Sequence, residues 1–200
     1  VGRLLPRQLQ HLISQSSGSF AVPVFQSWAF DDANITGHFT RIVPLPNASP
    51  REAHYEALNL GEYLHKDQDD RRGIFLLRVQ AWDPQNDRPL AGYAAQEWNG
   101  AKQALTSDAR LNVVTDLGLL AKRSVDGSRD VFVQSIATGE PVAGATVEVI
   151  GRNGLPVIGE TTTDQGHVRF PDLKGYTRER QPVFYLVRRG GDSSFLPLDE

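Results

Sequence analysis

Short stretches of alternating apolar and polar residues recur along the second half of the chain. Ala145, Val147 and Val149 alternate with Thr146 and Glu148, which is the pattern of a strand with one buried face. Further strands are predicted over residues 111–115, 117–123, 130–136, 157–163, 167–170, 181–188 and 193–197. Asp126-Gly127 and Gly166 mark tight turns between them. About eight short strands at this spacing predict an antiparallel β-sandwich.

The first half of the chain alternates less regularly. Its strongest predicted strand covers residues 73–82 and is apolar on both faces, as a central strand should be. Weaker strands are predicted over 19–28 and 35–45, and residues 55–64 read as a strand that runs into a helical turn. Apolar residues at 5, 9, 12 and 13 predict a short helix over 5–14, with Pro6 in its first turn.

These patterns predict an all-β chain of two tandem antiparallel β-sandwiches, similar to fibronectin III or Ig-like domains, with a short N-terminal helix. We place the first domain, with its helical lead-in, at residues 1–107 and the second at 108–200. The polar stretch over 83–108 holds the link between them.

Composition and charge exclude several classes of function. The chain carries 21 basic and 24 acidic side chains, a net charge of −3, and so offers no basic platform for nucleic acid. Cys is absent, which excludes disulfides, thiol nucleophiles and Cys-based metal sites within these residues. Because Met is absent as well, we expect the chain to be a piece of a longer protein.

The residues that could carry chemistry do not form a recognisable site. The histidines lack the spacing of metal ligands; they are His11, His38, His54, His65 and His167. The aspartates at 67, 69 and 70 are followed by Arg71 and Arg72, whose charges would repel a calcium ion, so a solvated turn is predicted there.

Motifs for nucleophilic catalysis and phosphate binding are missing too. No Gly-x-Ser-x-Gly or Gly-x-x-x-x-Gly-Lys occurs. Gly190-Gly191 is predicted to be a hairpin turn rather than an anion nest. Trp28 and Trp82 are expected in a core, and Trp98 at a contact between modules. No catalytic, cofactor-binding or metal-binding residue is therefore predicted, no cofactor is expected, and the chain is expected not to be an enzyme.

Several segments together resemble one protein family. The core of the resemblance is Gly139-x-Pro-Val-x-Gly-Ala-x-Val147, followed by Thr163-Asp-x-Gly166. The longer matching segments are residues 115–124, 130–136, 138–149, 163–171 and 185–198, with 58–64 and 73–79 in the first half. These segments strongly resemble macroglobulin-like domains from the N-terminal region of bacterial α2-macroglobulins.

The resemblance implies a function that the residues alone do not show. Proteins of this family are periplasmic, often membrane-anchored, and are built from many macroglobulin-like sandwiches. A protease cuts a bait region, the molecule changes shape and the protease is held. The expected partners are thus the other domains of the parent chain and target proteases, with envelope proteins as a further class.

Two other functions stay open at this point. The Gly-x-Pro-Val-x-Gly core also occurs in other exported sandwich modules, so an envelope binding or adhesion module is one alternative. An accessory domain of a hydrolase is the other.

Overall fold

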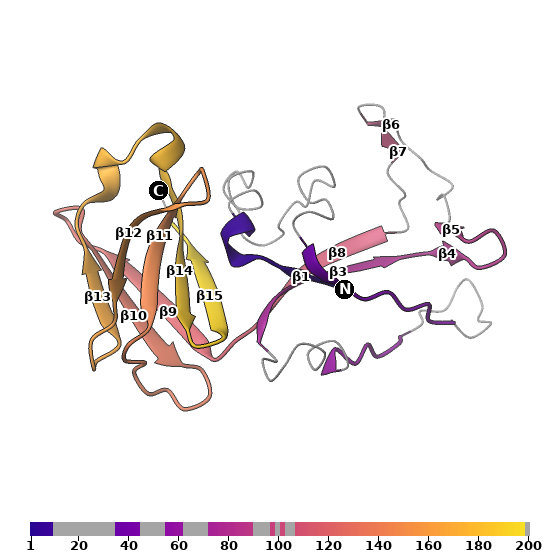
Figure 1. Ribbon diagram of the computed structural model, residues 1–200, viewed down its shortest axis with the longest axis horizontal. Helices are drawn as coiled ribbons and strands as arrows, with labels where there is room; N and C mark the ends of the chain where they lie inside the picture. Colours follow the sequence, from indigo (N-terminus) through magenta and orange to yellow (C-terminus); the bar gives the residue numbers. More distant parts are fainter. Residues whose placement is uncertain are drawn as a thin grey trace.

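The computed structural model describes residues 1–9, 35–44, 55–61, 72–89, 97–98, 101–102 and 107–198. Its strands pair antiparallel throughout these residues. Figure 1 shows two groups of strands, β1–β8 and β9–β15, joined by one crossing of the chain after β8. We call these groups the first and the second module.

The second module is a sandwich of two sheets. One sheet has the order β13-β10-β9 and consists of His167–Phe170, Arg129–Ser135 and Leu117–Arg123. The other has the order β12-β11-β14-β15 and consists of Pro156–Thr161, Thr146–Gly151, Pro182–Arg189 and Asp192–Pro197. Two turns of 3₁₀ helix, Leu173–Gly175 and Arg178–Arg180, lie between β13 and β14. The strands predicted for this half are therefore confirmed, apart from small shifts at their ends.

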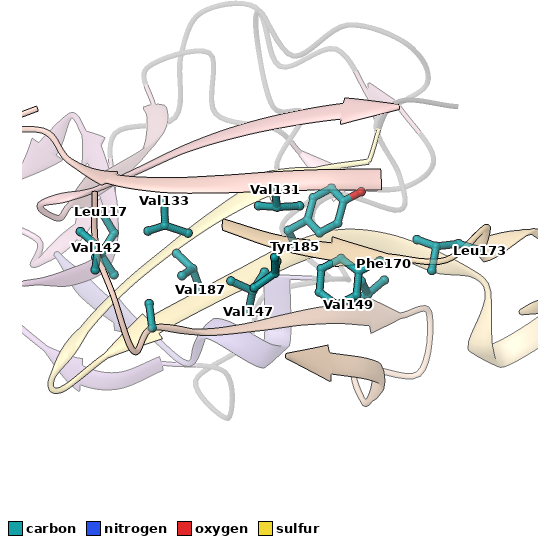
Figure 2. Close-up of a cluster of buried hydrophobic side chains, with 12 residues drawn as sticks. Leu117, Val131, Val133, Val142, Val147, Val149, Phe170, Leu173, Tyr185 and Val187 are labelled. Carbon is teal, nitrogen blue, oxygen red and sulfur yellow. The ribbon is translucent and has the colours of Figure 1, made fainter. Parts of the chain in front are cut away.

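The core of the second module lies between its two sheets. Val131 and Val133 of β10 face Val147 and Val149 of β11, and all four side chains are at most 1% exposed. Figure 2 shows these valines beside Phe170 and Tyr185 from β13 and β14. The predicted alternation in β11 is confirmed, because Thr146 is exposed while its neighbours Ala145 and Val147 are buried. A strand with one face to the core and one to water requires this alternation.

Two glycines and one threonine fix the turns around this core. Gly144 and Gly166 have φ values of +70° and +67°, a backbone conformation that residues with a Cβ rarely adopt. A Cβ on Gly166 would also collide with the carbonyl oxygen of Val133, whereas Gly144 has open space around it. Thr162 is 5% exposed; its hydroxyl donates to the carbonyl of Val142 (2.7 Å) and accepts from the N–H of Ala145 (2.8 Å).

The first module is described as one four-stranded sheet and two small hairpins. The sheet has the order β2-β1-β3-β8 and consists of Ile35–His38, Gly2–Leu4, Gly73–Gln80 and Ser107–Val114. The hairpins pair β4 (Trp82–Asp83) with β5 (Arg88–Pro89), and β6 (Glu97–Trp98) with β7 (Ala101–Lys102). Among the described residues, no helix is long and apolar enough to cross a membrane.

The structure corrects three details of the first half. The predicted helix over 5–14 is a 3₁₀ turn at Pro6–Leu9 as far as it is described, and Gly2–Leu4 before it forms β1. The strand predicted over 35–45 ends at His38, and residues 55–59 are not a strand. Residues 39–44 and 55–59 have no partner strand within the described part of the chain, and an alternating pattern alone does not make a strand.

Strand β8 bears on where the two modules divide. The sequence pattern placed residues 111–115 with the second module, but β8 pairs along its whole length with β3 of the first sheet. The chain then crosses to β9 within two residues, Thr115 and Asp116. A domain division at residues 107 and 108 stays a prediction.

Candidate inter-module interface

Strand β14 is buried on both of its faces. Phe184, Tyr185, Leu186 and Val187 are each at most 1% exposed. Tyr185 and Val187 point into the core of the sandwich, and Phe184 and Leu186 belong to a separate apolar cluster on the outer side. Because successive side chains of a strand point to opposite faces, four buried residues in a row require a partner on each face. The second partner is the first module.

This second cluster, which we call the interface cluster, joins the two modules. From the first module it contains Leu4, Leu9, Ile74 and Leu76, and from the second Ile150, Phe184 and Leu186. All of these side chains are at most 5% exposed. Phe195 of β15 packs edge-to-face on Phe184, with ring centroids 6.2 Å apart. Burial of these apolar side chains stabilises the contact by the hydrophobic effect, which has no strong directional preference.

A buried carboxylate lies at the point where the chain crosses between the modules. Asp192, the first residue of β15, is 4% exposed. Its Oδ2 accepts from the guanidinium of Arg72 (2.8 Å) and from the N–H of Asp116 (2.9 Å), and its Oδ1 accepts from the hydroxyl of Thr115 (2.7 Å). One side chain of the β14–β15 hairpin thus binds Arg72, immediately before β3, and both residues of the linker. These bonds offset the cost of burying its charge.

Both ends of this network are anchored within their own modules. The carbonyl oxygen of Arg72 accepts from the guanidinium of Arg3 (2.8 Å), which belongs to β1. The carboxylate of Asp116 accepts from the N–H of Ala137 and from the hydroxyl of Ser135, each at 2.8 Å. These hydrogen bonds hold the pKa of Asp116 below its usual value. The linker is therefore attached to Ser135 and Ala137 by the carboxylate of Asp116, and to Asp192 by the hydroxyl of Thr115 and the N–H of Asp116.

A second polar contact lies on β11. Glu148 accepts from Arg188 of the neighbouring strand (2.8 Å) and from Arg7 of the first module (3.5 Å). The glutamate side chain is 13% exposed, but the two arginines are 43% and 49% exposed. Solvent screens such pairs, so we assign Glu148 a minor share of the stability.

The residues considered for chemistry in the sequence are not brought together. His38 ends β2 and is exposed, while His167 lies on β13 with its Nε2 2.8 Å from Oδ1 of Asp130 and its ring stacked on Phe132. No group of three or more metal-ligating side chains occurs within the described residues. His11, His54, His65, Trp28, Arg71 and the aspartates at 67, 69 and 70 lie outside them.

Gly190 lies in a turn, and Asp83, Trp82 and Trp98 lie in short strands. Gly190 has a φ of +58° in the β14–β15 turn, so the hairpin prediction is confirmed. Asp83 accepts from the N–H groups of Gln85 and Asn86 and caps the β4–β5 turn. Trp82 is partly buried in β4. Trp98 lies in β6, and its contact between modules stays a prediction.

Sequence reasoning missed the residues that join the modules. Arg72 was considered only as a charge that repels a cation, and Asp192 was not considered. One signal was present: residues 183–187 are apolar without alternation, which indicates a strand buried on both faces. Nothing in the sequence indicated which segment covers the second face.

Comparisons with known proteins agree with this architecture. Residues 114–200 match the family model described as "Bacterial alpha-2-macroglobulin MG3 domain". A crystal structure of native alpha-2-macroglobulin from Escherichia coli spanning domains NIE-MG1 shares the fold, with a TM-score of 0.57 and 20% identity over 98% of this chain and 80% of that chain. One spanning MG0-NIE-MG1 has a TM-score of 0.56 and 22% identity, over 99% of this chain and 53% of that chain. The fold thus defines the class: macroglobulin-like β-sandwich modules in a mostly β chain.

Sequence relatives define the family. An "Alpha-2-macroglobulin homolog" from Yersinia pestis is 41% identical over 197 residues, 98% of this chain. An "Alpha-2-macroglobulin" from Pasteurella multocida is 40% identical over 202 residues, 100% of this chain. The chain belongs to the bacterial α2-macroglobulins and corresponds to their N-terminal macroglobulin-like region, which confirms the resemblance seen in the sequence. It spans 10% of the length of these relatives.

Proposed function

We propose that this chain forms part of the wall of a periplasmic inhibitor that traps proteases after bait cleavage, and that it acts there as a structural and interaction element rather than as an enzyme. The names of its relatives support the inhibitor class. The interface cluster supports the structural role, because it holds the two modules in contact through buried apolar side chains. Attachment to the membrane through the parent chain is part of the same proposal.

The observation that carries the proposal is the doubly buried strand β14. A strand that shares one face with each module transmits a displacement of one to the other. A protease trap needs such coupling, because a cut in one segment must change the shape of the whole molecule. Binding modules joined by flexible linkers would not need an apolar contact of this kind.

The test uses the full-length parent protein incubated with a protease. We measure the residual activity of the protease on a small peptide substrate and on a large protein substrate. Trapping predicts that activity on the large substrate is lost while activity on the small one remains. Equal loss or equal retention on both would contradict the proposal. A stable envelope partner captured without any protease would instead favour an adhesion or binding module.

A second arm of the experiment tests the role of the interface. The full-length parent that carries Phe184→Ala should trap less protease than the wild type, because coupling between the modules is weakened. Phe132→Ala is a suitable control, since Phe132 lies outside both apolar clusters and is 36% exposed. If the two variants trap equally well, the interface does not contribute to trapping.

A further inference from the structure

We propose that Asp192 is the positioning residue that fixes the orientation of the two modules, and that loss of its contacts frees the modules to move while each stays folded. The orientation is a property of this chain. Its use in protease capture rests on the function proposed above.

The interface cluster holds the modules together but does not fix the angle between them. Apolar contacts between Leu4, Ile74 and Leu76 on one side and Phe184 and Leu186 on the other hold the modules together. Such contacts depend on buried area and tolerate small rotations and shifts. They provide affinity between the modules, but a defined angle needs a directional contact.

Asp192 provides that directional contact. Its two oxygens accept from three donors in two segments: Arg72, immediately before β3, and Thr115-Asp116 in the linker. Hydrogen bonds to a charged group are short and depend on geometry. A rotation about the linker would have to break at least one of them. Thr115 is itself held, because its Oγ1 also accepts from the N–H of Leu117 (2.9 Å).

The contact can be released without unfolding either module. The side chain of Arg72 is 48% exposed, so it returns to water easily and its ion pair is screened. Asp192 belongs to neither apolar cluster. Loss of the contact therefore leaves both clusters in place, and the angle between the modules is what changes.

Because the chain contains no Cys, a pair of spin labels can be placed at unique positions in the 200-residue chain. We choose Val79→Cys on β3 and Glu160→Cys on β12, since both positions are exposed. Pulsed electron spin resonance then gives the distribution of distances between the modules. We expect one narrow distribution for the labelled wild type.

Variants at Asp192 separate charge from shape. Asp192→Asn keeps the shape and loses the charge that binds Arg72, whereas Asp192→Ala removes all three contacts. We expect Asp192→Ala to broaden or split the distribution and Asp192→Asn to do so to a smaller extent. The control is Asp126→Asn, because the partners of Asp126 are Ser128 and Arg169 within the second module. This control should leave the distribution unchanged.

Variants of the partner residue keep the proposal testable if an Asp192 variant fails to fold. Arg72→Gln should broaden the distribution, and Arg72→Lys, which keeps a positive donor, should restore much of the narrow form. A folded Asp192→Ala chain with the wild-type distribution would overturn the proposal. So would equal broadening by Arg72→Gln and Arg72→Lys, or broadening by Asp126→Asn. These results concern the orientation alone, so they are independent of whether the parent protein traps a protease.

Discussion

Replacing Phe184 by alanine should detach the first sheet from the sandwich before it affects the sandwich core. Phe184 is 0% exposed, belongs to the interface cluster and packs edge-to-face on Phe195. Truncation of a fully buried Phe costs about 3–5 kcal/mol. At about 1.4 kcal/mol per factor of ten, the equilibrium for opening the interface rises by about 10²–10⁴.

Phe170→Ala is the matched control for this prediction. Phe170 is also 0% exposed and also lies on a strand, but it belongs to the core of the second module. The same truncation should therefore cost a similar free energy at a different place. The two variants should therefore differ in which strands lose stability, because each ring belongs to a different cluster.

Hydrogen exchange of the backbone amides measures where the free energy is lost. In Phe184→Ala, the amides of β1 and β3 should exchange faster, and those of β10 and β13 should stay close to wild type. In Phe170→Ala, β10 and β13 should lose protection. The reasoning is refuted if Phe184→Ala leaves β1 and β3 as protected as in the wild type, or if both variants give the same pattern.

Three further predictions concern the second module and the linker. Gly166→Ala should lower the free energy of unfolding by more than Gly144→Ala in denaturant titrations, because the φ values are similar and only Gly166 lies against a carbonyl oxygen; equal losses would contradict this. Thr162→Val should cost about 1–3 kcal/mol in the same titrations, since two buried backbone groups lose their partner, and a loss near zero would contradict the hydrogen bonds described. The hydrogen bonds of Asp116 lower its pKa in the folded chain below the usual value of 3.8. Its contribution to stability is therefore present above pH 3.8 and is lost as the pH falls further. Asp116→Asn should make the unfolding free energy fall less steeply below that pH, and an unchanged slope would contradict the assignment.

Most of the second module was predictable from local pattern. Val147 and Val149 alternate with polar residues, and glycines at 127, 144 and 166 stand where the backbone has a positive φ. These signals lie within a few residues of one another, so they do not depend on the rest of the fold. The resemblance to a known family lay mainly in the same segments.

The first module was less predictable because its strands depend on partners far away in the sequence. Gly2–Leu4 is too short to show a period, yet it pairs with both Ile35–His38 and Gly73–Gln80. Residues 111–115 were recognised as a strand, but no local feature indicated pairing with β3. Pairing over such distances is settled by which apolar faces are left uncovered.

The sequence by itself determined that the chain is all-β, that its second half is a sandwich and that no recognisable catalytic motif is present. Only the tertiary structure decided that β14 is shared between two modules and that Asp192 binds Arg72, Thr115 and Asp116. The physical reason is the separation along the sequence of the residues that make each feature. Alternation and turns are properties of neighbouring residues, whereas an interface joins residues far apart in the sequence: Arg72 and Asp192 are 120 positions apart, and Arg7 and Glu148 are 141 apart.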